Sequence, residues 1–129
     1  MKPKILIIDD ERSIRILLES FLLRSGYEVE SRDDGEKAFE WLETNLPDLI
    51  ICDVQMKNMD GYTFVQKLRE RGHTKNTPVV MLSGVEGSKE RVKCYKLGAQ
   101  DFLVKPFNPD ELHEIIKKNL NPIHYAIKW

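Results

Sequence analysis

The chain has 129 residues, of which 41% are hydrophobic and 32% are charged. This balance is typical of a folded protein with one domain and argues against a disordered chain. With 20 basic and 21 acidic residues the formal net charge is −1, so nothing indicates nucleic acid or an anionic membrane as the main partner.

The first half of the chain alternates short apolar runs with amphipathic segments. Residues 4–8 are apolar with β-branched members and predict a strand. A helix is predicted to follow and to end near Gly26, because apolar residues recur at helical spacing: Ile14, Leu17, Leu18, Phe21 and Leu22. Residues 27–31 alternate as a strand does, a second helix follows, and the apolar run at residues 49–52 leads into Asp53.

The second half continues the same alternation. A third helix is predicted to begin near Asp60, and strands are predicted at residues 78–83 and 101–104. The helix between these two strands, at about residues 87–97, is poorly amphipathic because its charged side chains outnumber its apolar ones. The last helix has a capping-box sequence with Asn108 as its N-cap.

Five predicted strands that alternate with five predicted helices indicate an α/β protein built from parallel βαβ units. The first, third and fourth strands are almost wholly apolar, as expected for strands that are covered on both faces. Right-handed crossovers then place helices on both sides of the sheet, so the pattern predicts three layers.

Polar residues stand at the carboxyl ends of four of these strands: Asp9 and Asp10, Asp53, Ser83, and Lys105. Taken singly, an aspartate in such a place is most often a helix cap, and the serine and lysine suit ordinary turns. In an open parallel sheet, however, the carboxyl ends lie on one edge, which is where ligands bind. The joint placement therefore favours a functional site.

The residue types at this edge suit phosphoryl chemistry. Three carboxylates in one crevice repel each other unless a cation shares the site, and Mg²⁺ prefers such oxygen ligands together with a phosphate. A lysine amine and a serine hydroxyl can bind phosphoryl oxygens. Because a carboxylate can itself carry a phosphoryl group, Asp53 is the predicted nucleophile.

In combination, five motifs of the chain resemble those of the receiver domain of two-component response regulators: ILIIDDE, PDLIICD, MDG, VVMLSG and GAQDFLVKPF. The similarity covers about residues 3–121. It implies a flavodoxin-like α/β/α sandwich in which a five-stranded parallel sheet of order 2-1-3-4-5 carries five helices. It also implies a receiver domain at residues 1–121, with residues 122–129 as a tail or the start of an inter-domain linker.

The resemblance implies a role for each residue of the cluster. Asp53 would accept the phosphoryl group. Mg²⁺, or Mn²⁺ in its place, would be ligated by Asp10, Asp53 and the backbone carbonyl of Gln55, whereas Asp9 would act mainly through a metal-bound water. Lys105 would bind the phosphoryl oxygens.

The resemblance also implies a switch. Ser83 would move toward the phosphoryl group, Phe102 would swing inward as it does so, and the Lys105–Pro106 peptide bond is expected to be cis. Phosphorylation, which adds roughly −1.5 to −2 charges, would thereby shift the surface of the fourth helix and fifth strand. Two residues depart from the family pattern: Phe102 stands where many members carry tyrosine, and Lys57 where proline is usual.

The expected partners follow from this resemblance. A sensor histidine kinase or phosphotransfer protein would donate the phosphoryl group, and a downstream effector or a C-terminal output domain absent from this chain would read the switch. A dimer through the fourth helix, fifth strand and fifth helix is also expected. The isolated Cys52 and Cys94 favour a cytoplasmic protein, and the lack of an apolar run of about 20 residues argues against a membrane span. The net charge of −1 argues against direct nucleic-acid contacts.

Two alternatives remain open from the sequence. A pseudo-receiver would act as an interaction module without phosphorylation, although such a module does not require the complete set of site residues. An aspartyl-phosphate phosphohydrolase would need a second acid two residues after its nucleophile, where this chain has Gln55. A receiver is a switch rather than an enzyme, because its chemistry is limited to its own phosphorylation and autodephosphorylation.

Overall fold

The computed structural model of the chain describes residues 2–84 and 87–120. Five strands alternate with five helices along the sequence. The strands are β1 (Lys4–Ile8), β2 (Glu28–Arg32), β3 (Leu49–Asp53), β4 (Val79–Ser83) and β5 (Asp101–Val104). The helices are α1 (Arg12–Arg24), α2 (Gly35–Leu42), α3 (Gly61–Glu70), α4 (Ser88–Lys96) and α5 (Pro109–Asn119).

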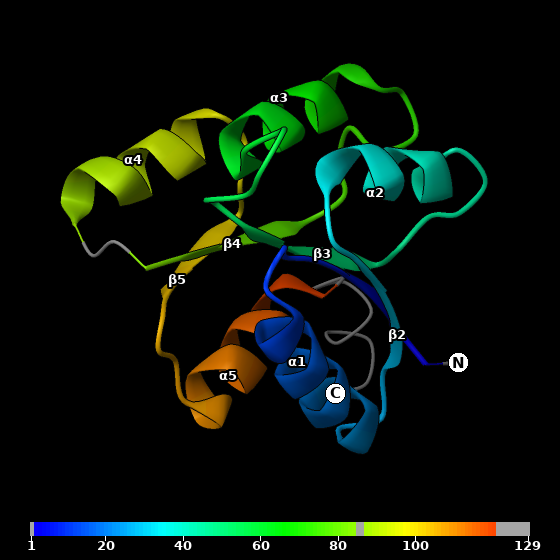
Figure 1. The fold of residues 1–129 in the computed structure, drawn as a ribbon, viewed down its shortest axis with the longest axis vertical. Helices are drawn as coiled ribbons and strands as arrows, with labels where there is room; N and C mark the ends of the chain where they lie inside the picture. Colours follow the sequence, from blue (N-terminus) through cyan, green and yellow to red (C-terminus); the bar gives the residue numbers. More distant parts are fainter. Residues whose placement is uncertain (1, 85–86, 121–129) are drawn as a thin grey trace.

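The strands form one parallel sheet of order β2-β1-β3-β4-β5, which confirms the expected topology. Helices α2, α3 and α4 cover one face of this sheet, and α1 and α5 cover the other (Figure 1). The chain therefore has the predicted flavodoxin-like arrangement of three layers. In such a sheet the carboxyl ends of all strands lie along one edge, so the loops that follow β1, β3, β4 and β5 meet there.

Alternating side chains of the strands build two apolar cores, one on each face of the sheet. In β1, Leu6 and Ile8 pack beneath α2 and α3, whereas Ile5 and Ile7 pack against α1 and α5. All four are fully buried, which explains why β1 is apolar without a polar face. The polar residues that follow the strands are consequently carried by a sheet that is buried on both faces.

Side chains cap the N-termini of three helices, and the N-cap predicted at Asn108 is confirmed. The side chains of Asp34, Asp60 and Asn108 accept hydrogen bonds from the backbone N–H of the third residue of α2, α3 and α5, each at 2.8 Å. The first helix differs, because its N-cap is Glu11 and makes no side-chain cap. The predicted strand at residues 27–31 begins one residue later, since Tyr27 precedes β2 and packs into the core.

None of the helices in the described ranges is both long and apolar enough to cross a membrane. The tail predicted at residues 122–129 lies outside the described residues.

Candidate functional site

The structure brings the three predicted carboxylates together. Asp9 and Asp10 follow β1, and Asp53 ends the neighbouring strand β3. Each of the three offers a carboxylate oxygen, and these oxygens all lie within 4.8 Å of one another. Asp9 and Asp53 are buried and Asp10 is half-buried, so the cluster is a pocket rather than an open acidic surface.

Lys105 reaches the same cluster from the end of β5. Its Nζ lies 3.1 Å from Asp9 Oδ2 and 3.3 Å from Asp53 Oδ1. The side chain of Glu11, which the sequence did not single out, also approaches it, with 3.8 Å between Glu11 Oε1 and the amine. The Lys105–Pro106 peptide bond is cis. The ammonium group of Lys105 thus bridges the two buried carboxylates.

Backbone N–H groups orient each carboxylate. Asp9 Oδ1 accepts from the amide of Glu11 at 2.9 Å, and Asp53 Oδ1 from the amide of Gln55 at 3.4 Å. Asp10 Oδ2 accepts from the amide of Lys57 at 3.1 Å. A proline at position 57 would have no N–H for this bond, so the departure from the family pattern adds a contact that holds the loop to Asp10.

Burial and the neighbouring charges together shift the pKa values of Asp53 and Lys105. Burial and the adjacent Asp9 carboxylate raise the pKa of Asp53 from 3.8 to about 6, although Lys105 opposes this shift. Burial alone would lower the pKa of Lys105, but Asp9 and Asp53 outweigh it and raise that pKa. Near neutral pH the lysine is cationic and Asp53 is ionised at a cost, which an added cation would relieve.

The two predicted switch residues lie on β4 and β5. Ser83 is buried at the end of β4 and pairs in register with Val104 of β5. Phe102 is 2% exposed, and the guanidinium of Arg91 on α4 lies over its ring, 5.1 Å from the centroid. The ring is thus already buried in this structure. Its inward swing on phosphorylation remains a prediction.

Comparison with known proteins places this geometry in a family. The family model for the response regulator receiver domain matches residues 5–117. The chain belongs to the response regulator receiver family. Members of this family are signalling domains of two-component systems. The receiver family therefore accounts for the fold and for the edge of the sheet at which the polar residues meet.

Individual relatives agree with this assignment. The receiver domain is 40% identical over 117 residues to the alkaline phosphatase synthesis transcriptional regulatory protein PhoP of Bacillus subtilis, covering 91% of this chain and 48% of PhoP. The chain spans about half the length of the relatives of this kind that it matches.

Among solved structures, chemotaxis protein CheY4 of Vibrio cholerae superposes with a TM-score of 0.89 at 36% identity, covering 93% of this chain and all of that one. The receiver domain of sensor histidine kinase PA1611 of Pseudomonas aeruginosa superposes with a TM-score of 0.85 at 27% identity, covering 93% and 98%. That structure has a magnesium ion coordinated in the active site cleft.

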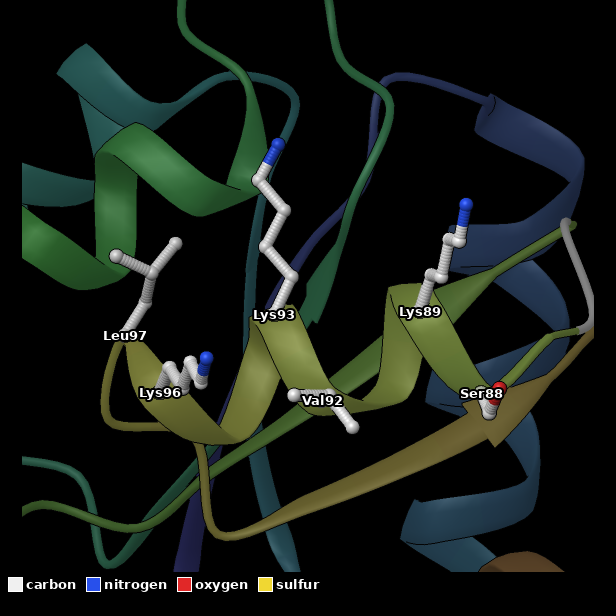
Figure 2. Close-up of a pocket in the computed structure, with 6 residues that line it drawn as sticks. All are labelled: Ser88, Lys89, Val92, Lys93, Lys96 and Leu97. Atoms are coloured by element: carbon white, nitrogen blue, oxygen red, sulfur yellow. The ribbon is translucent and has the colours of Figure 1, made fainter.

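A hollow of about 510 Å³ adjoins the acidic pocket of the receiver domain. It lies between the loop after β3 and the side of α4, and it is lined by Asp10, Val54, Gln55, Met56, Lys57, Asp60, Tyr62, Glu90 and Lys93. A second hollow, of about 520 Å³, lies along the outer side of α4 (Figure 2).

Gly61 allows the chain to pass close behind Asp53. A Cβ at position 61 would lie 2.4 Å from the Asp53 backbone oxygen and 2.9 Å from Val54 Cα. We expect Gly61→Ala to lower the free energy of unfolding by about 1–3 kcal/mol, because backbone atoms must shift to admit the methyl group. Urea denaturation followed by circular dichroism measures this change.

Gly72→Ala is the matched control, because a Cβ there would meet no atom within 4 Å. An equal loss of stability in both variants would show that the close approach at Gly61 is not the cause.

Proposed function

We propose that this receiver domain accepts a phosphoryl group on Asp53 in a Mg²⁺-dependent reaction and thereby switches a signalling surface. The observation that carries the proposal is the placement of Asp53. Its carboxylate lies within 4.8 Å of those of Asp9 and Asp10, and one of its oxygens lies 3.3 Å from Lys105 Nζ. Such a pocket offers a nucleophile, oxygen donors for a cation and a fixed positive charge.

The donor set fits Mg²⁺, or Mn²⁺ in its place. Hard divalent ions bind carboxylate and carbonyl oxygens, and three carboxylates converge here. Asp10, Asp53 and the backbone carbonyl of Gln55 would hold the ion directly, and Asp9 would act through a water. When bound, the ion supplies positive charge against the phosphoryl oxygens. The magnesium described for the PA1611 receiver supports this choice.

In the proposed phosphoryl transfer, the chain supplies the nucleophile and a positive charge. A carboxylate oxygen of Asp53 attacks the phosphorus of a phosphohistidine on a sensor kinase or phosphotransfer protein. The new P–O bond forms as the P–N bond breaks, and the imidazole nitrogen leaves with the electron pair. Lys105, which bridges Asp9 and Asp53 beforehand, turns its ammonium to the transferred phosphoryl oxygens. The acyl phosphate is later hydrolysed by water, and no external substrate is turned over.

The switch would begin at Ser83, which moves toward the phosphoryl group, and continue through Phe102 to α4 and β5. The partners we propose are a histidine kinase upstream and an effector or C-terminal output domain downstream. The transcriptional regulators among the relatives support the latter, because they are about twice as long as this chain. We also propose a receiver unit at residues 1–121, a cytoplasmic location, and dimerisation through α4, β5 and α5.

Incubation with Mg²⁺ and acetyl phosphate tests the proposal directly. We expect intact mass spectrometry to show a gain of one phosphoryl group, because acetyl phosphate presents the same transferable group as the kinase. The gain should vanish when EDTA removes the divalent ion. A chain that gains no mass with either small donors or kinases would instead be a pseudo-receiver that works without phosphorylation.

A further inference from the structure

The side chain of Arg69 ties α3 to the end of α4. Its Nε and Nη2 donate to the carbonyl oxygen of Gly98 at 3.0 and 2.7 Å. Nη1 donates to the carbonyl of Thr74 at 3.1 Å, and Nη2 also to Gln100 Oε1 at 2.9 Å. Gln100 Oε1 in turn accepts from the amide of Val79 at 2.7 Å. One guanidinium therefore joins α3, the segment that ends α4, and the start of β4.

Gly98 is adapted to this contact. It ends α4 with a φ of +107°, and a Cβ there would lie 3.1 Å from both Cγ and Nε of Arg69. The backbone closes the helix at the same point, since the Ala99 amide donates to the Cys94 carbonyl at 3.0 Å. Any other residue at position 98 would meet both a strained backbone and the arginine.

Two residues in the second half of α4 also approach α3 or share its apolar core. Cys94 is the only buried residue of α4 itself. Lys93 extends toward α3 (Figure 2), where its Nζ lies 4.1 Å from the centroid of the Tyr62 ring.

The N-terminal end of α4 lacks a comparable side-chain contact at its cap. Its N-cap, Gly87, provides no side-chain cap, and Val92 is 48% exposed beside the outer hollow. Farther along the helix, the guanidinium of Arg91 lies over the ring of Phe102 in the proposed switch. Arg91 is thus near the middle of α4, two residues before Lys93. The bonds from Arg69 lie at the C-terminal end of the helix, whereas its first turn begins without a side-chain cap.

We propose that Arg69 is a positioning residue that anchors the C-terminal end of α4, so that the helix pivots about Gly98 when the switch operates. The pivot rests on the proposed function, whereas the anchor does not. Because α4 follows β4 closely in the chain, a movement at Ser83 reaches its N-terminal end first. The output surface would then change in orientation along α4 rather than shift as a whole.

Amide hydrogen exchange of the unphosphorylated protein tests the anchor. Arg69→Met should accelerate exchange at Leu97 and Ala99 by about tenfold, since net hydrogen bonds of about 1 kcal/mol each are lost. Arg69→Lys should have an intermediate effect, because an ammonium can still donate to one carbonyl but cannot reproduce the forked contact with Gly98. The matched control is Arg71→Met, which removes a guanidinium that lies over the Phe39 ring of α2. Equal exchange at α4 in the Arg69→Met and Arg71→Met variants would overturn the anchor.

Exchange in Mg²⁺ and fluoroberyllate, a phosphoryl mimic, tests the pivot. In the natural chain, changes should concentrate at Arg91 and Val92 and spare Leu97 and Ala99. In Arg69→Met they should extend along the whole helix. Equal changes at both ends of α4 in the natural chain would overturn the pivot. A protein that shows no response to fluoroberyllate and no mass gain from acetyl phosphate would refute the proposed function and the pivot together, while the unphosphorylated comparison still decides the anchor.

Discussion

Asp53→Asn is expected to abolish the phosphoryl mass gain entirely. The substitution preserves the shape of the side chain but replaces a carboxylate oxygen with an amide nitrogen, which is a poor nucleophile and a poor ligand for Mg²⁺. Lys105 would still be paired with Asp9 at 3.1 Å, so the pocket should keep its arrangement. Intact mass spectrometry after incubation with acetyl phosphate and Mg²⁺ measures the loss.

Asp60→Asn is the matched control for this experiment. Asp60 lines the hollow beside the pocket and caps α3 by accepting from the amide of Thr63, a role that asparagine fills equally well. It should therefore retain the mass gain of the natural chain. A mass gain that persists in Asp53→Asn but disappears in Asp60→Asn would place the phosphorylated residue elsewhere.

The features that could be predicted from the sequence depend on short-range patterns. Strands β1, β3 and β4 are continuous apolar runs, because each is covered on both faces, and their ends are marked by polar residues. Parallel strands place all their carboxyl ends at the same end of the sheet, so the sequence alone predicted that Asp9, Asp53 and Lys105 lie on one side of the molecule. The strand order itself was implied by the family resemblance.

Features that rest on contacts between distant segments could not be predicted. Lys105 and Glu11 approach to 3.8 Å, and the Lys57 amide reaches Asp10, 47 residues away in the chain. The bonds from Arg69 to Gly98 span 29 residues. Nothing in local spacing distinguishes Arg69 from a solvated helix arginine, because its partners are backbone carbonyls whose positions depend on how α3 and α4 pack.

The electrostatics of the pocket lead to the second large effect, on stability. The pKa of Asp53 rises from 3.8 to about 6 in the folded protein, first because of burial and then because of Asp9. The folded state therefore holds this proton more tightly than the unfolded state does, and ionising Asp53 costs stability. The cost is absent below about pH 4, grows as the pH rises, and is fully developed above about pH 6, where two pKa units correspond to about 3 kcal/mol at most.

In EDTA at pH 8, Asp53→Asn should accordingly be more stable than the natural chain by about 1–3 kcal/mol, and the two should converge near pH 4. Urea denaturation at each pH measures the difference. Added Mg²⁺ should then stabilise the natural chain much more than the variant, because an ion that binds only the folded state favours folding, and the variant lacks one of its ligands. Asp60→Asn should follow the natural chain in both comparisons. A natural chain that is the more stable of the two at pH 8 without metal would mean that Lys105 outweighs burial and Asp9, so that the charge on Asp53 stabilises the fold.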